Sequence, residues 1–438
     1  MSKSAPQKLG MIFTKVPGTR DILPAEVHWW QKREEIARKV FSLYNYQEMR
    51  PPLLEKANLF NRSLGESSEI VQKQMFLATR YLAARETQAD SWDLYALRPE
   101  GTASVVRAYL ENNLDKIAGL SKFYYCGPMF RAERPQKGRL RQFHHLGAEA
   151  IGSTDARLDA EIISLADTLL KAFAIEGYKI KINSLGCAQD KKALSGPLRQ
   201  ELKDKIHKLC PDCQRRFKNN VLRILDCKKE ACQEIIRKLE IKDAHLCPEC
   251  LAHFSKVKKC LQSLKIDYQI APLLVRGLDY YTRTVFEIVH QKLGSQDALG
   301  AGGRYDSLVK ELGGPQVGAM GFALGMERLF LVSKATEDQS SGRNLTYIIS
   351  LGEEATEAAL KLLFDLRQAG IPADTDYENK SLKGALRRAN DLKARYVLIL
   401  GEDELKKNIV TFKVMASGEQ KEIKTEELIK ELIAAYGL

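Results

Sequence analysis

Apolar positions near the start of the chain follow the period of a helix. Between Ala25 and Tyr46 they recur at spacings of three and four, which predicts an amphipathic helix with one face packed on a sheet. Pro51 and Pro52 cannot continue a helix, so the stretch from Leu53 to Phe60 is expected to be extended. The sequence therefore predicts a helix, a break and an extended segment in this region.

The stretch from Phe123 to Gly152 has the pattern of an antiparallel hairpin. A strand leads into a loop rich in Arg, Pro, Lys and Gly, and a second strand runs from Arg141 to Ile151. The next expected elements are a helix over 155–176 and strands over 178–185, 268–274 and 284–290. A run of small residues from Gly318 to Gly325 then enters a helix. These elements together predict one main sheet.

Changes in composition divide the chain into parts. At 438 residues it is too long for one hydrophobic core. We expect a first domain at 1–335, a polar linker at 336–343 and a second domain at 344–438. A helical, basic and cysteine-rich segment at 187–262 interrupts the first domain. In the second domain, strands and helices alternate as in a compact α/β unit.

The positive charge is concentrated in the middle of the chain. The formal net charge is +12, from 68 Lys and Arg against 56 Asp and Glu. Residues 187–262 hold 18 basic and 10 acidic residues, whereas residues 344–438 hold 14 and 16. Six basic residues are nevertheless predicted on one helix of the last domain: Lys380, Lys383, Arg387, Arg388, Lys393 and Arg395. Such charge favours a polyanionic partner, and solubility alone is the alternative explanation.

The sequence shows no sign of a membrane protein. No apolar run approaches the roughly 18 residues that a spanning helix needs. The first twenty residues lack the apolar core of a secretory signal. We therefore expect a cytoplasmic protein, with an organelle transit peptide as the alternative.

Arginines are the candidates for holding phosphate. Neither of the glycine-rich phosphate-binding patterns, G-x-x-x-x-G-K-[ST] and G-x-G-x-x-G, occurs in the chain. A guanidinium group offers bidentate bonds to phosphate oxygens instead. Arg131, on the first strand of the hairpin, and Arg328, at the start of a predicted helix, could supply them. Taken alone, each could also be an ordinary surface arginine.

A second group of polar and aromatic residues precedes a predicted strand. The segment LVRGLDYY brings together Arg276, Asp279, Tyr280 and Tyr281, and Gly277 allows close approach of the backbone. Convergent groups of this kind are typical of a small-molecule pocket. Packing of the paired tyrosines in a core is the alternative.

Two Cys-x-x-Cys pairs lie in the basic insertion. Cys210 with Cys213 and Cys247 with Cys250 have a spacing that suits a tetrahedral zinc ion with a structural role. The pairs are 33 residues apart, and Cys227 and Cys232 compete as ligands. Free, reduced thiols are the alternative.

Several motifs resemble those of the histidine–tRNA ligases, a family of class II aminoacyl-tRNA synthetases. GPMFRAERPQKGRLRQFHHLG at 127–147 is similar to motif 2, GFALGMERL at 321–329 to motif 3, and LVRGLDYY at 274–281 and AGGRYD at 301–306 to two histidine signatures. Pro52 matches the motif 1 proline, and RPEGT at 98–102 resembles a substrate loop. The resemblance spans essentially the whole chain.

This resemblance implies a fold and an activity. The fold is α+β: a class II antiparallel sheet flanked by helices, with a helical insertion and a C-terminal α/β anticodon-binding domain. The implied enzyme joins L-histidine and ATP into histidyl-adenylate with release of pyrophosphate, and then transfers histidine to the 3′-terminal adenosine of tRNA(His). The resemblance also implies Mg²⁺, and a homodimer, because motif 1 around Pro52 forms the subunit interface in this class.

The resemblance also assigns roles to residues. Arg131 and Arg276 are placed at the α-phosphate, Arg276 also at the substrate carboxylate, and Arg328 at the γ-phosphate. The residues implied for histidine binding are Glu100, Gly101, Thr102, Arg131, His145, Glu149, Arg276, Tyr280, Tyr281 and Tyr305. Within this set, Glu100 and Thr102 are expected at the α-amino group. Glu149, Tyr281 and Tyr305 are expected near the imidazole, whose two nitrogens need one donor and one acceptor.

One position departs from the family pattern. The family usually has glutamine where this sequence has His145, after Arg141, Gln142, Phe143 and His144. A neutral imidazole offers one donor or one acceptor on its free side, but not the amide's pair at once. We therefore expect substrate affinity or pH dependence to differ from the family pattern.

Two other functions share parts of this pattern. A regulatory subunit of ATP phosphoribosyltransferase has the same catalytic fold and binds histidine without charging tRNA, but such proteins resemble the catalytic domain alone. A nonenzymatic tRNA-sensing module would be fused to further domains. The intact signature segments and the C-terminal unit favour the ligase.

Overall fold

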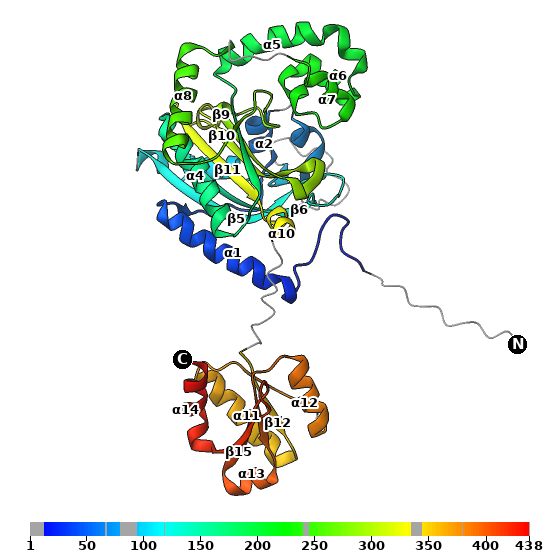
Figure 1. Cartoon of the computed structure of the whole chain (residues 1–438), viewed down its shortest axis with the longest axis vertical. Helices are drawn as coiled ribbons and strands as arrows, with labels where there is room; N and C mark the ends of the chain where they lie inside the picture. The colour runs from blue at the N-terminus through cyan, green and yellow to red at the C-terminus, as the bar shows by residue number, and fades with distance from the viewer. Residues whose placement is uncertain are drawn as a thin grey trace, which may run out of the picture. The chain divides into compact units, whose positions relative to one another are not determined.

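The computed structural model describes residues 13–65, 68–78, 94–117, 119–239, 245–333, 344–378 and 380–437. They fall into two compact units that divide between residues 334 and 335. Figure 1 shows that each unit has its own sheet and its own helices. The linker predicted at 336–343 lies outside the described residues.

An eight-stranded sheet forms the centre of the first unit. Its strands lie in the order β1-β5-β6-β11-β10-β9-β7-β8. They are β1 (Gln47–Glu48), β5 (Ser121–Phe130), β6 (Gln142–Ile151), β7 (Tyr178–Ser184), β8 (Gln269–Ile270), β9 (Thr282–His290), β10 (Ala298–Arg304) and β11 (Ala319–Gly325). The six inner strands are antiparallel to their neighbours, and only the short edge strands pair in parallel. The predicted antiparallel sheet and its β5–β6 hairpin are confirmed.

Helices cover both faces of this sheet. They are α1 (Pro24–Leu43), α2 (Ala57–Leu64), α3 (Thr102–Glu111), α4 (Ala156–Ala172), α8 (Pro248–Ser263), α9 (Leu308–Glu311) and α10 (Met326–Val332). Apolar side chains of α1, α4, α8 and α10 pack on one face, and those of α2, α3 and α9 pack on the other (Figure 1). Successive side chains of a strand point to opposite faces. On β6, Leu146, Ala148 and Ala150 therefore enter the first core, while Glu149 points towards α3.

Two expectations about strands need correction. Leu53 to Phe60 is extended only over β2 (Leu54–Lys56), and α2 begins at Ala57, because Ala57, Phe60 and Leu64 share a helical face that is buried. The strand expected at 268–274 is limited to β8, because Pro272 has no N–H to continue the ladder. With β3 (Phe76–Ala78) and β4 (Tyr95–Leu97), β2 forms a separate three-stranded sheet.

Strand β10 was not predicted as a strand, because its glycines are residues that weaken strands. They are needed for close packing. A Cβ atom on Gly302 would lie 2.3 Å from the carbonyl oxygen of Gly321 on β11. The glycines thus let three strands approach closely at the middle of the sheet.

The insertion is helical, as predicted. It contains α5 (Ala188–Leu202), α6 (Pro211–Asn219), α7 (Glu230–Ile236) and the 3-10 turns Lys203–Lys208 and Val221–Asp226. These elements share a small core of their own. Helix α8 follows them in sequence but packs on α4 of the main domain, through Phe254, Val257 and Leu261. Helix α8 therefore anchors the insertion to the main domain.

The second unit is a five-stranded sheet with helices. The strand order is β13-β12-β14-β15-β16, with β13, β12 and β14 parallel and the others antiparallel. The strands are β12 (Thr346–Ser350), β13 (Ala373–Thr375), β14 (Tyr396–Leu400), β15 (Ile409–Val414) and β16 (Gln420–Lys424), and the helices are α11 (Glu353–Gln368), α12 (Leu382–Asp391), α13 (Glu402–Lys407) and α14 (Thr425–Tyr436). The basic cluster is not confined to one helix, because α12 ends at Asp391 and Arg395 instead lies over the ring of Tyr436.

Within the described part of the chain, no helix is both long enough and apolar enough to cross a membrane.

Candidate active site

A cavity of about 600 Å³ lies on the face of the sheet that α3 covers. Nine of the residues predicted to bind substrate line it: Glu100, Thr102, Arg131, His145, Arg276, Tyr280, Tyr281, Tyr305 and Arg328. They come from α3, β6, α10 and four loops. The floor, on β11, is made of Gly321, Ala323 and Gly325, whose small side chains leave the strand open to a ligand. The predicted set thus converges on one cavity.

Arg131 and Arg328 bring two cations to this cavity. Arg131 follows β5, and its Nε donates to the carbonyl oxygen of Pro99 at 2.9 Å while the guanidinium lies 5.3 Å from the ring centre of Phe143. Arg328, in the first turn of α10, donates to the carbonyl oxygens of Gly138 and Ala298. Burial lowers the pKa of both groups, that of Arg328 to about 10, with help from neighbouring arginines. Both remain charged at neutral pH, and an anion between them would relieve their repulsion.

Arg276 is held by a carboxylate that the sequence did not single out. Its Nη1 donates to Oε1 of Glu287 on β9 at 2.6 Å. Its Nε is buried and has no hydrogen-bond partner among the residues that the structure describes. Burial acts against the charge of Arg276, but Glu287 raises the pKa of Arg276 overall. The guanidinium is therefore fixed in position with a donor that remains for a ligand.

The RPEGT segment forms the start of α3. Both oxygens of Glu100 accept backbone N–H groups, from Thr102 at 2.7 Å and from Ala103 at 2.8 Å. These bonds lower the pKa of Glu100, but burial has the larger effect and raises it. Gly101 does not line the cavity. A Cβ atom there would lie 2.3 Å from the ring of Tyr125, so glycine is required by packing.

Glu149 lies just behind the cavity wall, at the centre of a buried hydroxyl network. Its Oε2 accepts from the hydroxyl of Tyr305 at 2.5 Å, and its Oε1 accepts from Thr102 at 2.7 Å and from Tyr125 at 3.4 Å. The side chain is fully buried over Gly321, where a Cβ atom would clash with it. Burial raises the pKa of Glu149 to about 8. The carboxyl group therefore accepts hydrogen bonds from three residues that line the cavity.

Three tyrosines form the aromatic wall of the cavity. The ring centre of Tyr280 lies 4.7 Å from that of Tyr281 and 5.7 Å from that of Tyr305. Burial raises the pKa of Tyr281 to about 12, so its hydroxyl stays a neutral donor at physiological pH. Both the core-packing alternative and the pocket interpretation apply to these tyrosines, because the three residues are buried and also line the cavity.

The two adjacent histidines point to opposite faces of β6. The backbone N–H of His144 and its Nδ1 both contact the carboxylate of Glu327 on α10, with Nδ1 2.9 Å from Oε1. The ring of His144 packs against Trp30 on α1. His145 instead lines the cavity, and its buried Nδ1 has no hydrogen-bond partner in the described part of the chain. Burial, followed by the charges of Arg131 and Arg328, lowers the pKa of His145 well below its usual value.

Sequence reasoning gave no individual role to three residues that support the site. Tyr125 on β5 pairs with Gly147 on β6 and reaches Glu149, and Glu287 holds Arg276. Arg98 donates to the carbonyl oxygens of Pro51 and Pro128, which fixes the RPEGT segment beside β5. Strand alternation could have revealed Tyr125, because it places this residue opposite a glycine on the face of Glu149.

The two Cys-x-x-Cys pairs do not meet. Each pair begins a different helix, α6 or α8, so the predicted four-ligand set is divided. Two groups of potential ligands result: Cys210, Cys213, Cys227 and Cys232 in one, and Cys187, Asp190, Cys247 and Cys250 in the other. Cys227 and Cys232, the competing ligands noted in the sequence, thus belong to the first group.

Comparisons with known proteins agree over the whole chain. The family model "Histidyl-tRNA synthetase" matches residues 18–329, and the model "Anticodon binding domain" matches residues 346–435. The protein named histidine–tRNA ligase from Syntrophotalea carbinolica is 44% identical over 97% of this chain and 99% of its own length. The crystal structure of apo S. aureus histidyl-tRNA synthetase has a TM-score of 0.77 at 33% identity and covers 96% of this chain and 100% of that chain.

A third likeness bears on the regulatory alternative. A structure described as an ATP phosphoribosyltransferase regulatory subunit/histidyl-tRNA synthetase from Bacillus halodurans C has a TM-score of 0.63 at 22% identity, and covers 89% of this chain and 99% of that chain. At this identity the likeness shows the fold alone.

An antiparallel sheet that carries arginines in place of a glycine-rich phosphate loop, joined to an anticodon-binding domain, defines a class II aminoacyl-tRNA synthetase. Such enzymes join an amino acid to tRNA. The chain belongs to the histidyl-tRNA synthetase family, and its function is that of a histidine–tRNA ligase.

Proposed function

We propose that both steps of the ligase reaction take place in the cavity above β11, with the roles assigned below. The carboxylate of L-histidine attacks the α-phosphorus of ATP, pyrophosphate leaves, and histidyl-adenylate forms. A ribose hydroxyl of the 3′-terminal adenosine of tRNA(His) then attacks the activated carbonyl carbon, and AMP leaves. The observation that carries this proposal is the convergence of three arginines and a buried hydroxyl–carboxyl network on one cavity.

The arginines suit the phosphate side of the reaction. Arg131 and Arg276 are assigned to the α-phosphate, and Arg328 to the γ-phosphate. Negative charge grows on the α-phosphate oxygens as the carboxylate attacks, and fixed cations stabilise it without reorganisation. The carbonyl contacts of Arg131 and Arg328 and the carboxylate contact of Arg276 hold them in place before substrate arrives.

Glu100 and Thr102 are assigned to the α-amino group of histidine. Both residues line the cavity, and Glu100 lies at the start of α3. A carboxylate has about four lone-pair sites, and only two of the Glu100 sites are used by the backbone N–H groups of Thr102 and Ala103. The remaining sites suit an ammonium group.

The network around Glu149 is assigned to the imidazole. Tyr281 and Tyr305 line the cavity, and the hydroxyl of Tyr305 donates its proton to Glu149. An apolar isostere of histidine would leave these buried polar groups unpaired, which a site of this kind rejects strongly. His145 takes the place of the family glutamine beside them.

ATP is a substrate of this family, and we infer that Mg²⁺ accompanies it. The carboxylates of Glu287 and Asp297 line the same cavity and are oxygen ligands of the kind that Mg²⁺ prefers. When bound, the ion would neutralise phosphate charge. The assignment of these two residues follows from their chemistry and location.

The tRNA is proposed to meet the chain at two basic regions. In the insertion, Arg216, Lys228 and Lys229 line the cavity and suit the phosphates near the acceptor end. In the second unit, Lys383, Arg387 and Arg388 lie on or beside the exposed side of α12. Phosphate contacts of this kind position a nucleic acid without reading its sequence.

A homodimer remains a prediction, and the structure offers a surface for it. Leu54 and Tyr95 lie on one face of the small β2–β4–β3 sheet that follows Pro52 and are exposed by 46% and 37%. An apolar patch of this kind on a charged protein suits a second copy of the chain. The cytoplasmic location also stays a prediction.

Histidine-dependent exchange of pyrophosphate into ATP tests the first step directly. Arg276→Ala should lower kcat/KM for exchange about 100- to 1,000-fold, because it removes a fixed cation at the reacting phosphate. Arg367→Ala, in the second unit and half-exposed, is the matched control and should leave exchange unchanged. Equal exchange in Arg276→Ala and wild type would overturn the assignment of this cavity.

A further inference from the structure

Within the described residues of the insertion, eight potential metal ligands lie in two groups that the ligase reaction does not use. We name Cys210, Cys213, Cys227 and Cys232 the four-cysteine cluster, and Cys187, Asp190, Cys247 and Cys250 the aspartate cluster. In each cluster, all four ligand atoms lie within 4.8 Å of one another.

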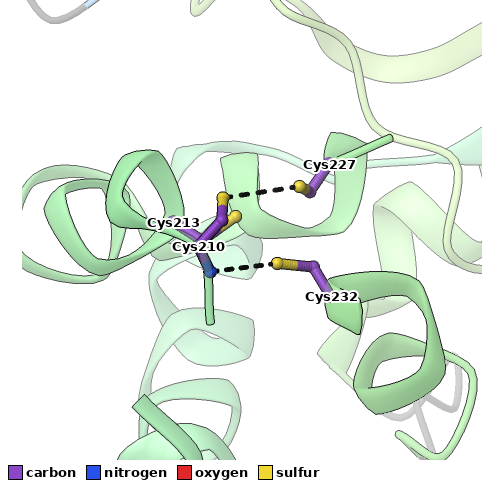
Figure 2. Close-up of side chains that lie close together, drawn as sticks. All are labelled: Cys210, Cys213, Cys227 and Cys232. Atoms are coloured by element: carbon purple, nitrogen blue, oxygen red, sulfur yellow. Dashed lines mark hydrogen bonds between the residues drawn. The ribbon is translucent and has the colours of Figure 1, made fainter. Parts of the chain in front are cut away.

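The four-cysteine cluster has the dimensions of a tetrahedral site. With zinc–sulfur bonds of about 2.3 Å, sulfurs at the corners of a tetrahedron are about 3.8 Å apart. The Sγ atoms of Cys210 and Cys227 are 3.9 Å apart, which fits a shared ion and is far too long for a disulfide. Figure 2 shows the four side chains pointing toward one another from three segments of the chain.

The surroundings of this cluster suit thiolates. Cys213, Cys227 and Cys232 are buried, and Cys210 is partly exposed. The backbone N–H of Cys210 donates to Sγ of Cys232 at 3.3 Å, which is the kind of bond that stabilises a metal-bound sulfur (Figure 2). Four protein ligands close the coordination shell, so a metal here would be structural and would hold no reacting water.

The aspartate cluster is built on two helix starts. Cys187 precedes α5 and Cys247 precedes α8, while Asp190 and Cys250 lie in the first turns. The carboxylate of Asp190 accepts from the backbone N–H groups of Cys187 at 3.1 Å and of Cys247 at 3.0 Å. It is 3% exposed and keeps lone pairs for an ion, because each oxygen has two.

The two clusters occupy structurally different places. The aspartate cluster joins α5, where the chain enters the insertion, to α8, which packs on α4 of the catalytic domain. The four-cysteine cluster joins α6, the turn Val221–Asp226 and α7, which are short helices around a small core. One cluster therefore anchors the insertion, and the other holds its outer part together.

We propose that the insertion binds two structural zinc ions, one in each cluster. The first is held by four thiolates, and the second by three thiolates and the Asp190 carboxylate. Each ion displaces the thiol protons of its ligands on binding. Zinc is the divalent ion that best matches closed tetrahedral sites of this size with sulfur-rich ligands.

The four-cysteine cluster is also connected to the active site through contacts with Asp279. Arg223, in the turn between Cys213 and Cys227, forms an ion pair of 2.9 Å with Asp279 of the LVRGLDYY segment. Asn220 donates to the same carboxylate at 3.0 Å. Cys210 and Cys227 themselves line the cavity. The first zinc ion is therefore a positioning device for the wall of the cavity that carries Tyr280 and Tyr281.

Zinc content of the full-length protein tests the proposal. The chain is purified without chelators after expression with zinc, and metal per chain is measured by mass spectrometry. Wild type should hold two zinc ions, Cys232→Ser and Cys250→Ser one each, and the double variant none. Cys260→Ser, on α8 and in neither cluster, is the matched control and should hold two. Fewer than two zinc ions in wild type, or another metal in their place, would overturn the proposal.

A second measurement on wild type holds even where the serine variants fail to fold. Thiols are alkylated before and after zinc is removed, and each cysteine is followed by peptide mass spectrometry. The seven cysteines of the two clusters should react faster without zinc, whereas Cys126 and Cys260 should react at the same rate. Equal rates for all nine would contradict the proposal.

The positioning role has its own readout. In Cys232→Ser, the KM for histidine in pyrophosphate exchange should rise several-fold more than in Cys250→Ser, because only the first site supports the contacts to Asp279. Readdition of Zn²⁺ to metal-depleted wild type should restore the KM. An unchanged KM in Cys232→Ser would restrict the first ion to stability and overturn this role.

Discussion

The catalytic sheet and the cysteine-rich insertion hold their functional residues in contrasting ways. Around the cavity, β5 and β6 pair over ten residues each, and the polar side chains are fixed by hydrogen bonds between strands of a large core. The insertion consists of short helices around twelve buried residues, three of which are cysteines. Small cores of this size rarely suffice for a stable fold without a cross-link.

This contrast between the sheet and the insertion indicates what makes each region rigid. In the sheet, burial and hydrogen bonding hold Arg276, Glu149 and Tyr305 before any ligand arrives. In the insertion, we infer that bound metal holds the residues in position. Perturbations of the cavity should therefore act on chemistry, and perturbations of the clusters should act first on local stability.

The largest expected effect is on the cavity. Arg131→Ala should lower kcat for pyrophosphate exchange about 100- to 1,000-fold while the unfolding temperature stays close to wild type, because the lost cation acts on the transition state. The matched control is Arg157→Ala, whose arginine lies exposed on α4 and should not affect exchange. A loss of activity that tracks a loss of folded protein would break the comparison.

Loss of zinc should act first on the local stability of the insertion, in contrast to loss of the Arg131 cation. In metal-depleted protein, limited proteolysis should cut within 188–239 at least about tenfold faster, because opening of the small core follows the lost binding energy. Cleavage within the β5–β6 hairpin should be unchanged. Uniform acceleration of cleavage across both regions would show that they are not held independently.

The Glu149 network should show an intermediate effect. Tyr305→Phe removes the hydroxyl that Glu149 orients, and should raise the KM for histidine about 10-fold, as expected for a hydrogen bond to a charged or strongly polarised group. Tyr347→Phe, a buried tyrosine in the second unit, is the control for loss of a hydroxyl. An identical KM in both variants would remove Tyr305 from the binding site.

Stability should depend on pH through Glu149. Because burial raises its folded pKa to about 8 from 4.5, its contribution to stability is complete below about pH 4.5 and is lost as pH rises through about 8. The free energy of unfolding of wild type should fall relative to Glu149→Gln over this window, by a few kcal/mol at most. Urea denaturation at several pH values measures it, and parallel curves would contradict the raised pKa.

The smallest effect concerns His145. Its lowered pKa makes it neutral across the physiological range, so it should add no step to the pH profile of histidine binding between pH 6.5 and 8. His145→Gln offers a donor and an acceptor together, and should lower the KM for histidine roughly 2- to 10-fold. A higher KM in the variant would mean that the imidazole is the better partner in this cavity.

Local patterns predicted much of the fold. The β5–β6 hairpin, α1 and the alternation in the second unit follow from periodicity that short stretches of sequence display. The start of α2 and the strand β10 were missed. Their identity depends on partners far along the chain: a buried face for Ala57 and the close backbone of Gly321 for Gly302.

The residues of the candidate site were predicted through motifs, but the contacts between them were not. The resemblance placed Glu149 near the imidazole, and the structure adds its hydrogen bonds to Thr102 and to Tyr305, which is 156 positions away in sequence. The cysteine clusters show the same limit. Spacing identified the two Cys-x-x-Cys pairs, whereas their partners depend on which helix each pair begins.

Aminoacylation of total tRNA with each of the twenty amino acids, in the presence of ATP and Mg²⁺, tests the account most directly. Wild type should charge tRNA with histidine alone, and Arg276→Ala should lose this activity although it remains folded. Charging with another amino acid, or a folded protein that binds histidine without charging tRNA, would contradict the assignment of the cavity to histidine activation and transfer.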